Sequence, residues 1–120
     1  MTRISRMNTN SKTRGADMLA EIERIQKVVS AHFGKDIAVM RGTVRTADAA
    51  WARHIAMFLA IELTGATLQV VAKAFGKRDH GTSRHALRAV KDRCDVYPED
   101  LAMVRFLRGQ VEDAFTKEAA

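Results

Sequence analysis

Two short helical patterns that meet at Gly76 constrain the fold of this chain more than any other feature. The first pattern begins after Thr67, a favoured N-cap residue, and places apolar side chains on one helical face. These side chains are Leu68, Val71, Ala72 and Phe75. Because glycine readily adopts the left-handed backbone conformation that ends helices, Gly76 predicts a tight turn directly after Phe75.

The second pattern is predicted to begin at Asp79, another favoured N-cap residue. Leu87, Val90 and Cys94 recur at helical spacing, so we expect them to face the core. The opposite face carries polar and mostly basic side chains, at Thr82, Arg84, Arg88 and Lys91. Two short helices that are joined by a tight turn, with the second strongly basic, are typical of a helix-turn-helix.

The start of the second helix combines positive charge with short polar side chains. Unpaired amide groups at a helix N-terminus attract anions, and Lys77 and Arg78 lie just before that end. A DNA phosphate is the natural occupant, and Asp79, His80 and Thr82 can reach base edges. The alternative is that Asp79 only caps the helix, that His80 is solvated and that the basic face serves solubility.

These residues also resemble a known family. AFGKRDHGT is similar to the AFGGRDHTT signature of the C-terminal DNA-binding domain (domain IV) of DnaA, the bacterial chromosomal replication initiator. RHIAMFLAIELTGATL is similar to RQxAMYLxRELTxxSL of the same domain, and the resemblance covers roughly Ile22 to Arg93. It implies an all-α, TrpR-like compact helical bundle that binds double-stranded DNA, at sites like the DnaA box.

The resemblance adds DNA-binding residues outside the second helix. The arginine aligned with Arg45 is expected to enter the minor groove, and Arg53 and His54 align with an Arg-Gln pair near DNA. An arginine on a loop suits a narrow, negative A·T minor groove, although a solvated loop arginine is the alternative. The predicted DNA-binding set is Arg45, Arg53, His54, Lys77, Arg78, Asp79, His80, Thr82, Ser83, Arg84 and Arg88.

Three departures from the family pattern are losses at the expected DNA interface. Gly81 replaces the first threonine of DHTT, which removes a hydroxyl expected at DNA and loosens the helix by about 0.5–1 kcal/mol relative to alanine. His54 replaces the usual glutamine, and Ile61 stands where a basic residue often occurs. DNA binding is therefore better supported than any particular target sequence.

Composition supports a helical protein with an anionic partner. Hydrophobic residues make up 47%, and one proline and seven glycines leave few helix breakers. The net charge of +6 points towards an anionic partner, and no apolar run is long enough to span a membrane. The single Cys94 suits a reducing compartment. We expect a cytoplasmic, nucleoid-associated bacterial protein with no membrane partner.

The chain is predicted to divide into an arm and one domain. Residues 1–15 hold several basic residues and no acid, so we expect a disordered basic arm that either touches DNA phosphates or is inert. Residues 16–118 are assigned to the helix-turn-helix domain. The phosphate-binding pattern GxxxxGK followed by Ser or Thr is absent. We therefore expect no nucleotide partner, no ATPase domain, no cofactor and no metal.

Two helical segments are predicted before the centre of the chain. The first runs from Asp17 to Phe33 along an apolar stripe and ends at Gly34. His32 on that stripe is expected to be a packed or boundary residue rather than a metal ligand. A short turn from Ile37 to Met40 then leads into a polar connection from Gly42 to Asp48.

Two longer helices complete the predicted bundle. Ala49 to Leu63 is apolar on more than one side, so this helix is expected to be central, with Trp51 on the core or on a partner. A closing helix begins near Pro98, which fits a first helical turn. Met103 and Phe106 fall off its buried stripe, and a dimer contact there is the alternative to plain packing.

Three classes of function compete. The leading hypothesis is sequence-specific duplex DNA binding, with a role in replication-origin control or transcription regulation. An enzyme would need Cys94 as the nucleophile with His85 or His80 as its base, but Cys94 lies on the core-facing stripe. A protein-interaction module that keeps the fold is the third class, and the basic face argues against it.

Overall fold

Helices alone build the part of the protein that the computed structural model describes, which is residues 11–42, 46–77 and 79–119. The side chains of residues 17–42, 46–77 and 79–117 are described within that part. The helices are α2 (Ser11–His32), α3 (Ala38–Arg41), α4 (Ala47–Thr64), α5 (Leu68–Ala74), α6 (Gly81–Val96) and α7 (Pro98–Ala119). The all-α prediction is confirmed, and none of these helices is long and apolar enough to cross a membrane.

The central helix is α4, as its apolar residues on several sides predicted. It packs against α2, α3, α5 and α6. Ala52, Ala56 and Ala60 recur every four residues on α4 and are fully buried. Their small side chains allow neighbouring helices to approach closely, and Trp51 beside them is also buried, which assigns it to the core.

The N-terminal helix α2 is longer than the sequence pattern predicted, because it begins at Ser11 rather than at Asp17. Residues 11–15 are thus helical although we expected them in the arm, and residues 1–10 lie outside the described residues. The early turns carry no apolar stripe, so periodicity could not reveal them. The helix ends as predicted, since Gly34 has φ 65° and the amide of Lys35 donates to the carbonyl of Ser30 at 2.8 Å.

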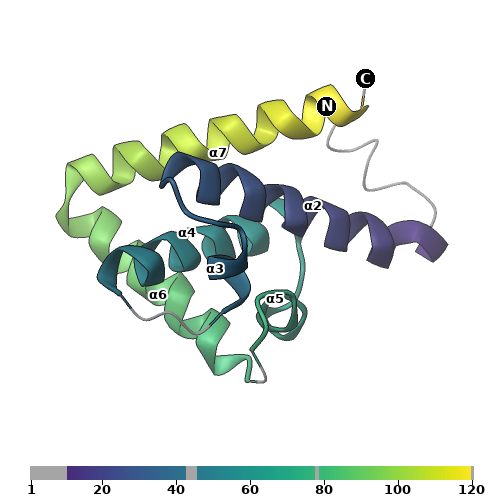
Figure 1. Cartoon of the computed structure of the whole chain (residues 1–120), viewed down its shortest axis with the longest axis horizontal. Helices are drawn as coiled ribbons and strands as arrows, with labels where there is room; N and C mark the ends of the chain where they lie inside the picture. Colours follow the sequence, from purple (N-terminus) through teal and green to yellow (C-terminus); the bar gives the residue numbers. More distant parts are fainter. Residues whose placement is uncertain (1–10, 43–45, 78, 120) are drawn as a thin grey trace.

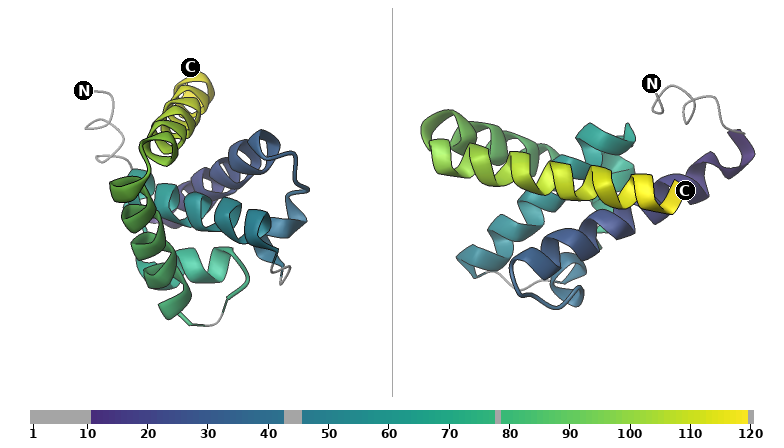
Figure 2. Two further views of the ribbon diagram at one scale, coloured as in Figure 1. Left: turned by 90° about the vertical axis from the view of Figure 1, so that its left-hand side faces the viewer. Right: turned by 90° about the horizontal axis from the view of Figure 1, so that it is seen from above.

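The closing helix α7 packs across α2 and α6. It runs along one side of the molecule, and α5 and the start of α6 lie on the opposite side (Figures 1 and 2). Val104, Leu107 and Val111 form its buried stripe. Phe106 falls off this stripe as predicted, is 55% exposed, and has its ring centre 5.9 Å from that of His32.

Candidate nucleic-acid interface

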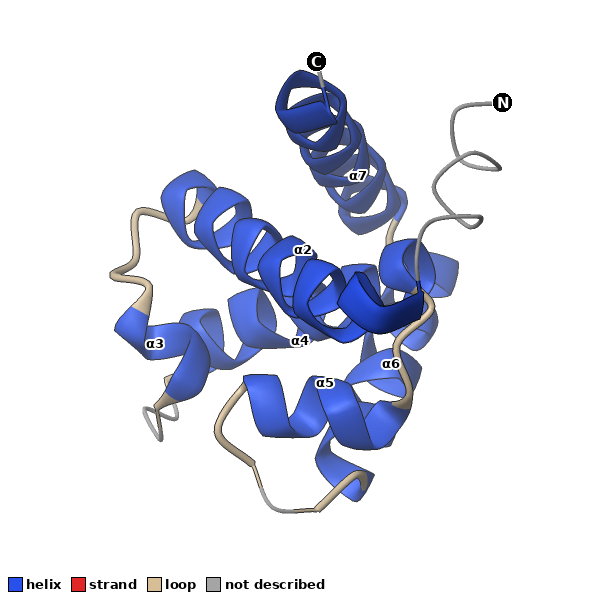
Figure 3. Cartoon of the chain, turned by 90° about the vertical axis from the view of Figure 1, so that its right-hand side faces the viewer, coloured by secondary structure: helices blue, strands red, loops and turns tan. Residues whose placement is uncertain are grey.

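Helices α5 and α6 form the predicted helix-turn-helix, and α5 and the start of α6 lie at the side of the bundle opposite α7 (Figure 3). The hydroxyl oxygen of Thr67 accepts a hydrogen bond from the amide of Val70 at 3.2 Å, which confirms the predicted N-cap of α5. Gly76 follows the last residues of α5 with φ 74°. The amide of Lys77 then donates to the carbonyl of Ala72 at 2.9 Å, which closes the end of the helix.

The start of α6 differs from the prediction, because the helix begins at Gly81 rather than directly after Asp79. The carboxylate of Asp79 accepts a hydrogen bond from the amide of Gly81 at 3.0 Å, and its backbone carbonyl accepts from the amide of Thr82 at 3.1 Å. These bonds form a local turn that precedes the helix. His80 occupies the position before Gly81, makes no capping bond, and is exposed.

The outer face of α6 is basic. Arg84, Arg88 and Lys91 are exposed at spacings of three and four residues, so they form one stripe along the helix. The inner face buries Ser83, Ala86 and Val90. The predicted orientation of Arg84 and Arg88 is confirmed, whereas their contact with DNA stays a prediction.

Ser83 was predicted to bind DNA, and the structure contradicts this. Its side chain is fully buried, and its hydroxyl donates to the carbonyl of Leu68 at 2.9 Å. Ser83 therefore holds α6 against the first residue of α5. The sequence could not reveal this role, because the bond depends on the tertiary position of a backbone carbonyl.

Arg53 was also expected near DNA, but it is 7% exposed. Its Nε and Nη2 atoms donate to the carbonyl of Val39 at 3.2 and 2.9 Å. Burial lowers the pKa of this guanidinium. Arg53 thus joins α4 to α3, and the family alignment alone gave no sign that its side chain points inward.

His54 lies beside His85 where α4 meets α6. Their ring centres are 5.3 Å apart and the rings are nearly perpendicular. Burial lowers the pKa of His54, and the nearby charges of His85 and Arg53 lower it further. His85 is exposed on the outer face of α6 but was not in the predicted DNA-binding set. His85 lies three residues after Thr82, and this spacing could have predicted that it shares the same face.

The remaining predicted residues divide into two whose side chains bond within the protein and two that lie outside the described residues. The hydroxyl of Thr82 donates to the backbone carbonyl of Asp79 at 2.9 Å. Lys77 is half-buried, and its Nζ donates to the carbonyl of Gly42 at 2.8 Å. Arg45 and Arg78 lie outside the described residues. Their assignment to the minor groove and to a phosphate therefore stays a prediction.

The far end of α6 is anchored by Arg93. Its guanidinium carbon lies 3.9 Å from the centre of the Trp51 ring, within reach of a cation–π interaction. Its Nε also donates to a carboxylate oxygen of Asp100 at 3.0 Å, and Asp100 is 6% exposed. Arg93 therefore connects α4, α6 and α7, so it holds α6 in place rather than extending the exposed basic stripe.

The alternative nucleophile has unfavourable surroundings. Burial raises the pKa of the Cys94 thiol, and the charges of Asp100 and Asp95 raise it further. A raised pKa leaves less of the reactive thiolate at neutral pH. His85 lies nine residues earlier on the same helix, about 13 Å along its axis, so it cannot act as the base for Cys94.

Comparison with known proteins assigns the family. Residues 22–90 match the family described as the bacterial DnaA protein helix-turn-helix. The chain belongs to this family. The matched range contains all of α3, α4 and α5 and most of α6, so it includes both helices of the helix-turn-helix.

Relatives and a solved structure agree with this assignment. The chromosomal replication initiator protein DnaA of Streptococcus equi subsp. zooepidemicus is 42% identical over 71 residues, which is 59% of this chain and 16% of the relative. The DnaA protein of Streptococcus pyogenes serotype M1 is 41% identical over the same shares. A crystal structure of a DNA replication initiation factor is 25% identical, with a TM-score of 0.79 over 86% of this chain and 32% of that one. The chain thus corresponds to a small part of these proteins.

Proposed function

We propose that this protein binds double-stranded DNA sequence-specifically, with α6 in the major groove. The observation that carries the proposal is the two-faced character of α6. Its inner face packs on the core through Ala86 and Val90, and its outer face presents Arg84, Arg88 and Lys91 to solvent. Such a helix can dock in a groove without any change to the fold.

Two kinds of contact are expected from the helix-turn-helix. The basic stripe of α6 and Arg78 serve phosphate contacts, which set affinity but carry no base information. His80 directly precedes α6 and Thr82 lies in its first turn, which is where recognition helices contact base edges. Asp79 has one carboxylate oxygen bonded to Gly81 and a side chain that is 80% exposed, which leaves it accessible to a base amino group.

The proposed target is a site similar to the DnaA box, and the proposed role is control at replication origins. Support comes from the curated relatives, which are chromosomal replication initiators. Arg45 is proposed to enter the adjacent minor groove, as the family resemblance implies. Gly81 lacks the hydroxyl of the family threonine, so the preferred site is expected to differ from the DnaA box at the base that this hydroxyl would contact. Transcription regulation at such sites is the alternative role, and it would use the same contacts with DNA.

A titration of fluorescent duplex DNA at several salt concentrations tests the proposal. Because neutralised phosphates release counterions, affinity should fall steeply as salt rises. Arg88→Gln should weaken binding and reduce the slope by about 0.9, the loss of one phosphate contact. Arg105→Gln removes the same charge from the exposed surface of α7 and should have a smaller effect. If the protein does not bind duplex DNA, or if its affinity does not depend on salt, the proposal is wrong.

A further inference from the structure

The turn of the helix-turn-helix lies directly against the end of α3. A Cβ atom at Gly76 would lie 2.6 Å from the carbonyl oxygen of Arg41, a distance that real Cβ atoms do not show. The two backbones therefore pack together with no side chain between them. This contact joins the turn between α5 and α6 to the point where the chain leaves α3 for α4.

Lys77 strengthens the same contact with its side chain. Its backbone is fixed at the end of α5 by the hydrogen bond that its amide donates to the carbonyl of Ala72 at 2.9 Å. Its Nζ reaches the carbonyl of Gly42 at 2.8 Å, across 35 positions of the sequence. A hydrogen bond from an ammonium group to a carbonyl in a half-buried place is stronger than one between neutral groups.

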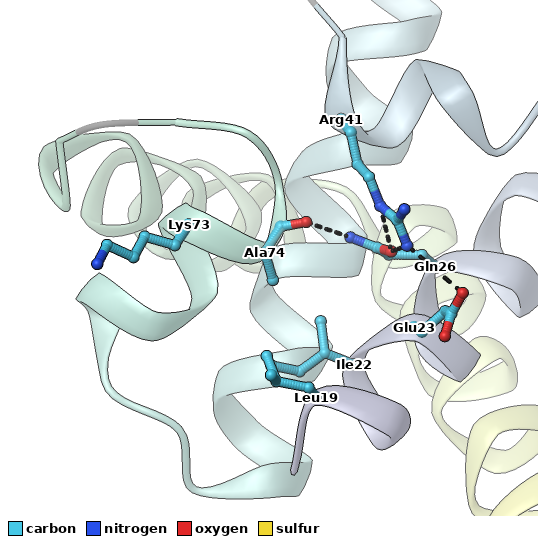
Figure 4. A pocket seen from close by; sticks show the side chains of 7 residues that line it. All are labelled: Leu19, Ile22, Glu23, Gln26, Arg41, Lys73 and Ala74. Atoms are coloured by element: carbon cyan, nitrogen blue, oxygen red, sulfur yellow. Dashed lines mark hydrogen bonds and ion pairs between the residues drawn. The ribbon is translucent and has the colours of Figure 1, made fainter. Parts of the chain in front are cut away.

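Gln26 of α2 supports this arrangement from the other side, as Figure 4 shows. Its side chain is 1% exposed, and its Nε2 donates to the carbonyl of Ala74 at 3.0 Å. Its Oε1 accepts from Nε and Nη2 of Arg41 at 3.2 and 2.9 Å. The end of α5 and the end of α3 are thus bound to a common buried residue, whereas Lys73 extends away from this cluster.

The lysine is a departure from the family signature quoted above. AFGGRDHTT has a glycine where this chain has Lys77 in AFGKRDHGT. A glycine has no side chain that could reach Gly42. The side-chain link between the turn and α3 is therefore a feature of this chain and not of the quoted signature.

We infer that Lys77 is a positioning residue for DNA binding rather than a phosphate contact. Its ammonium holds the carbonyl of Gly42 against the turn, and this fixes the end of α3 relative to the first turn of α6. The inference rests on the proposed DNA binding for its functional consequence, but the link itself belongs to the free protein. Loss of the link should therefore mainly lower the ratio of affinities for a selected site and a random duplex. It should have a smaller effect on the charge-driven affinity for all duplexes.

Lys77→Met tests the inference, with Lys73→Met as the matched control and Lys77→Arg as the conservative variant. Lys73 is an exposed lysine in the last turn of α5, so both methionine variants remove one positive charge from neighbouring positions. For Lys77→Met, we expect the salt slope to stay near that of the wild type. The ratio of affinities for a selected site and a random duplex should fall on the order of tenfold, the size of one charge-assisted hydrogen bond. Lys77→Arg should retain most of this ratio, because its guanidinium can reach the same carbonyl.

Three outcomes of the binding measurements would overturn the inference. A salt slope that falls by about 0.9 for Lys77→Met, with equal loss on all duplexes, is the signature of a phosphate contact. Equal behaviour of Lys77→Met and Lys73→Met would show only a general charge effect. An unchanged affinity ratio in Lys77→Met would remove the positioning role.

Hydrogen exchange on the DNA-free protein separates this inference from the proposed function. In Lys77→Met, the amides of residues 38–42 should exchange faster than in the wild type and in Lys73→Met, while those of α7 stay unchanged. If this occurs but the wild type does not bind duplex DNA, the link exists and the proposed function is wrong. If the wild type binds DNA but exchange at residues 38–42 is unchanged, Lys77 does not position α3 and the inference is wrong.

Discussion

The hydroxyl of Ser83 donates a hydrogen bond to the carbonyl of Leu68 at 2.9 Å, and this bond joins the two helices of the helix-turn-helix at their starts. Ser83 is fully buried, so water cannot replace the lost partner if the hydroxyl is removed. The angle between α5 and α6 therefore depends on a residue that never reaches the surface.

Ser83→Ala should lower the free energy of unfolding by about 0.5–1.5 kcal/mol, the usual net contribution of an internal hydrogen bond. Thr116→Ala is the control, because the hydroxyl of Thr116 donates to the carbonyl of Glu112 at 3.0 Å on the exposed surface of α7. Thr116→Ala should lower the free energy of unfolding by less than Ser83→Ala does. Urea denaturation measures both, and equal losses would contradict the role of Ser83 as a buried link.

Gly76→Ala should destabilise the protein more than Gly65→Ala. Both glycines have φ 74°, so alanine meets the same left-handed strain of about 1–2 kcal/mol at each. Only at Gly76 would the new Cβ lie 2.6 Å from the Arg41 carbonyl, whereas nothing lies within 4 Å at Gly65. Denaturation of the two variants isolates the cost of this contact, and a difference near zero would mean that the turn shifts away from α3 freely.

Gly81→Thr should restore a base contact and change the preferred DNA site. The threonine supplies the hydroxyl of the family signature, and one good base contact contributes about 1–3 kcal/mol to discrimination. Its Cβ would lie 3.3 Å from a carboxylate oxygen of Asp79, so this exposed side chain must move by a few tenths of an ångström. Gly81→Ala is the control, since it adds the Cβ without the hydroxyl. If both variants select the same sites, the hydroxyl has no part in recognition.

Stability should fall as pH is lowered through the range of His54. The pKa of His54 in the folded protein is lowered from 6.5, mainly by burial. Below pH 6.5 the unfolded chain binds the proton more readily than the folded protein does. The stability that neutral His54 contributes is therefore fully present above pH 6.5 and is lost as the pH falls below it. His54→Gln should flatten this part of the curve. Urea denaturation between about pH 5 and 8 measures the effect. A curve that is unchanged in His54→Gln would assign the pH dependence to other groups.

The order of the helices could be predicted from the sequence because it depends on local patterns. The apolar stripes predicted α4, α5, α6 and α7, and Gly76 marked the turn. Side-chain direction could not be predicted in the same way. Arg53 and Ser83 bind backbone carbonyls of Val39 and Leu68, which lie 14 and 15 positions away in the sequence. A polar residue in a family motif therefore does not reveal whether it faces DNA or the protein.

The start of α6 in the structure differs from the predicted start for a related reason. Both an N-cap and a local turn use the carboxylate of Asp79 to accept an amide hydrogen bond, so composition favours the two equally. The structure adopts the turn, and the helix then begins at Gly81. This placement leaves His80 exposed directly before the first turn of α6.

The central claim is that the first turn of α6 reads bases while the basic stripe holds phosphates. Binding-site selection on the wild type, His80→Ala, Asp79→Asn and Arg88→Gln tests it most directly. His80→Ala and Asp79→Asn should each relax the choice of base at one or two positions, by about 1–3 kcal/mol per contact. Asp79→Asn keeps an oxygen that can accept from Gly81, so its effect is separable from folding. Arg88→Gln should weaken all sequences alike and leave the selected motif unchanged. If all three variants weaken every sequence equally, α6 does not read bases and only non-specific DNA binding remains.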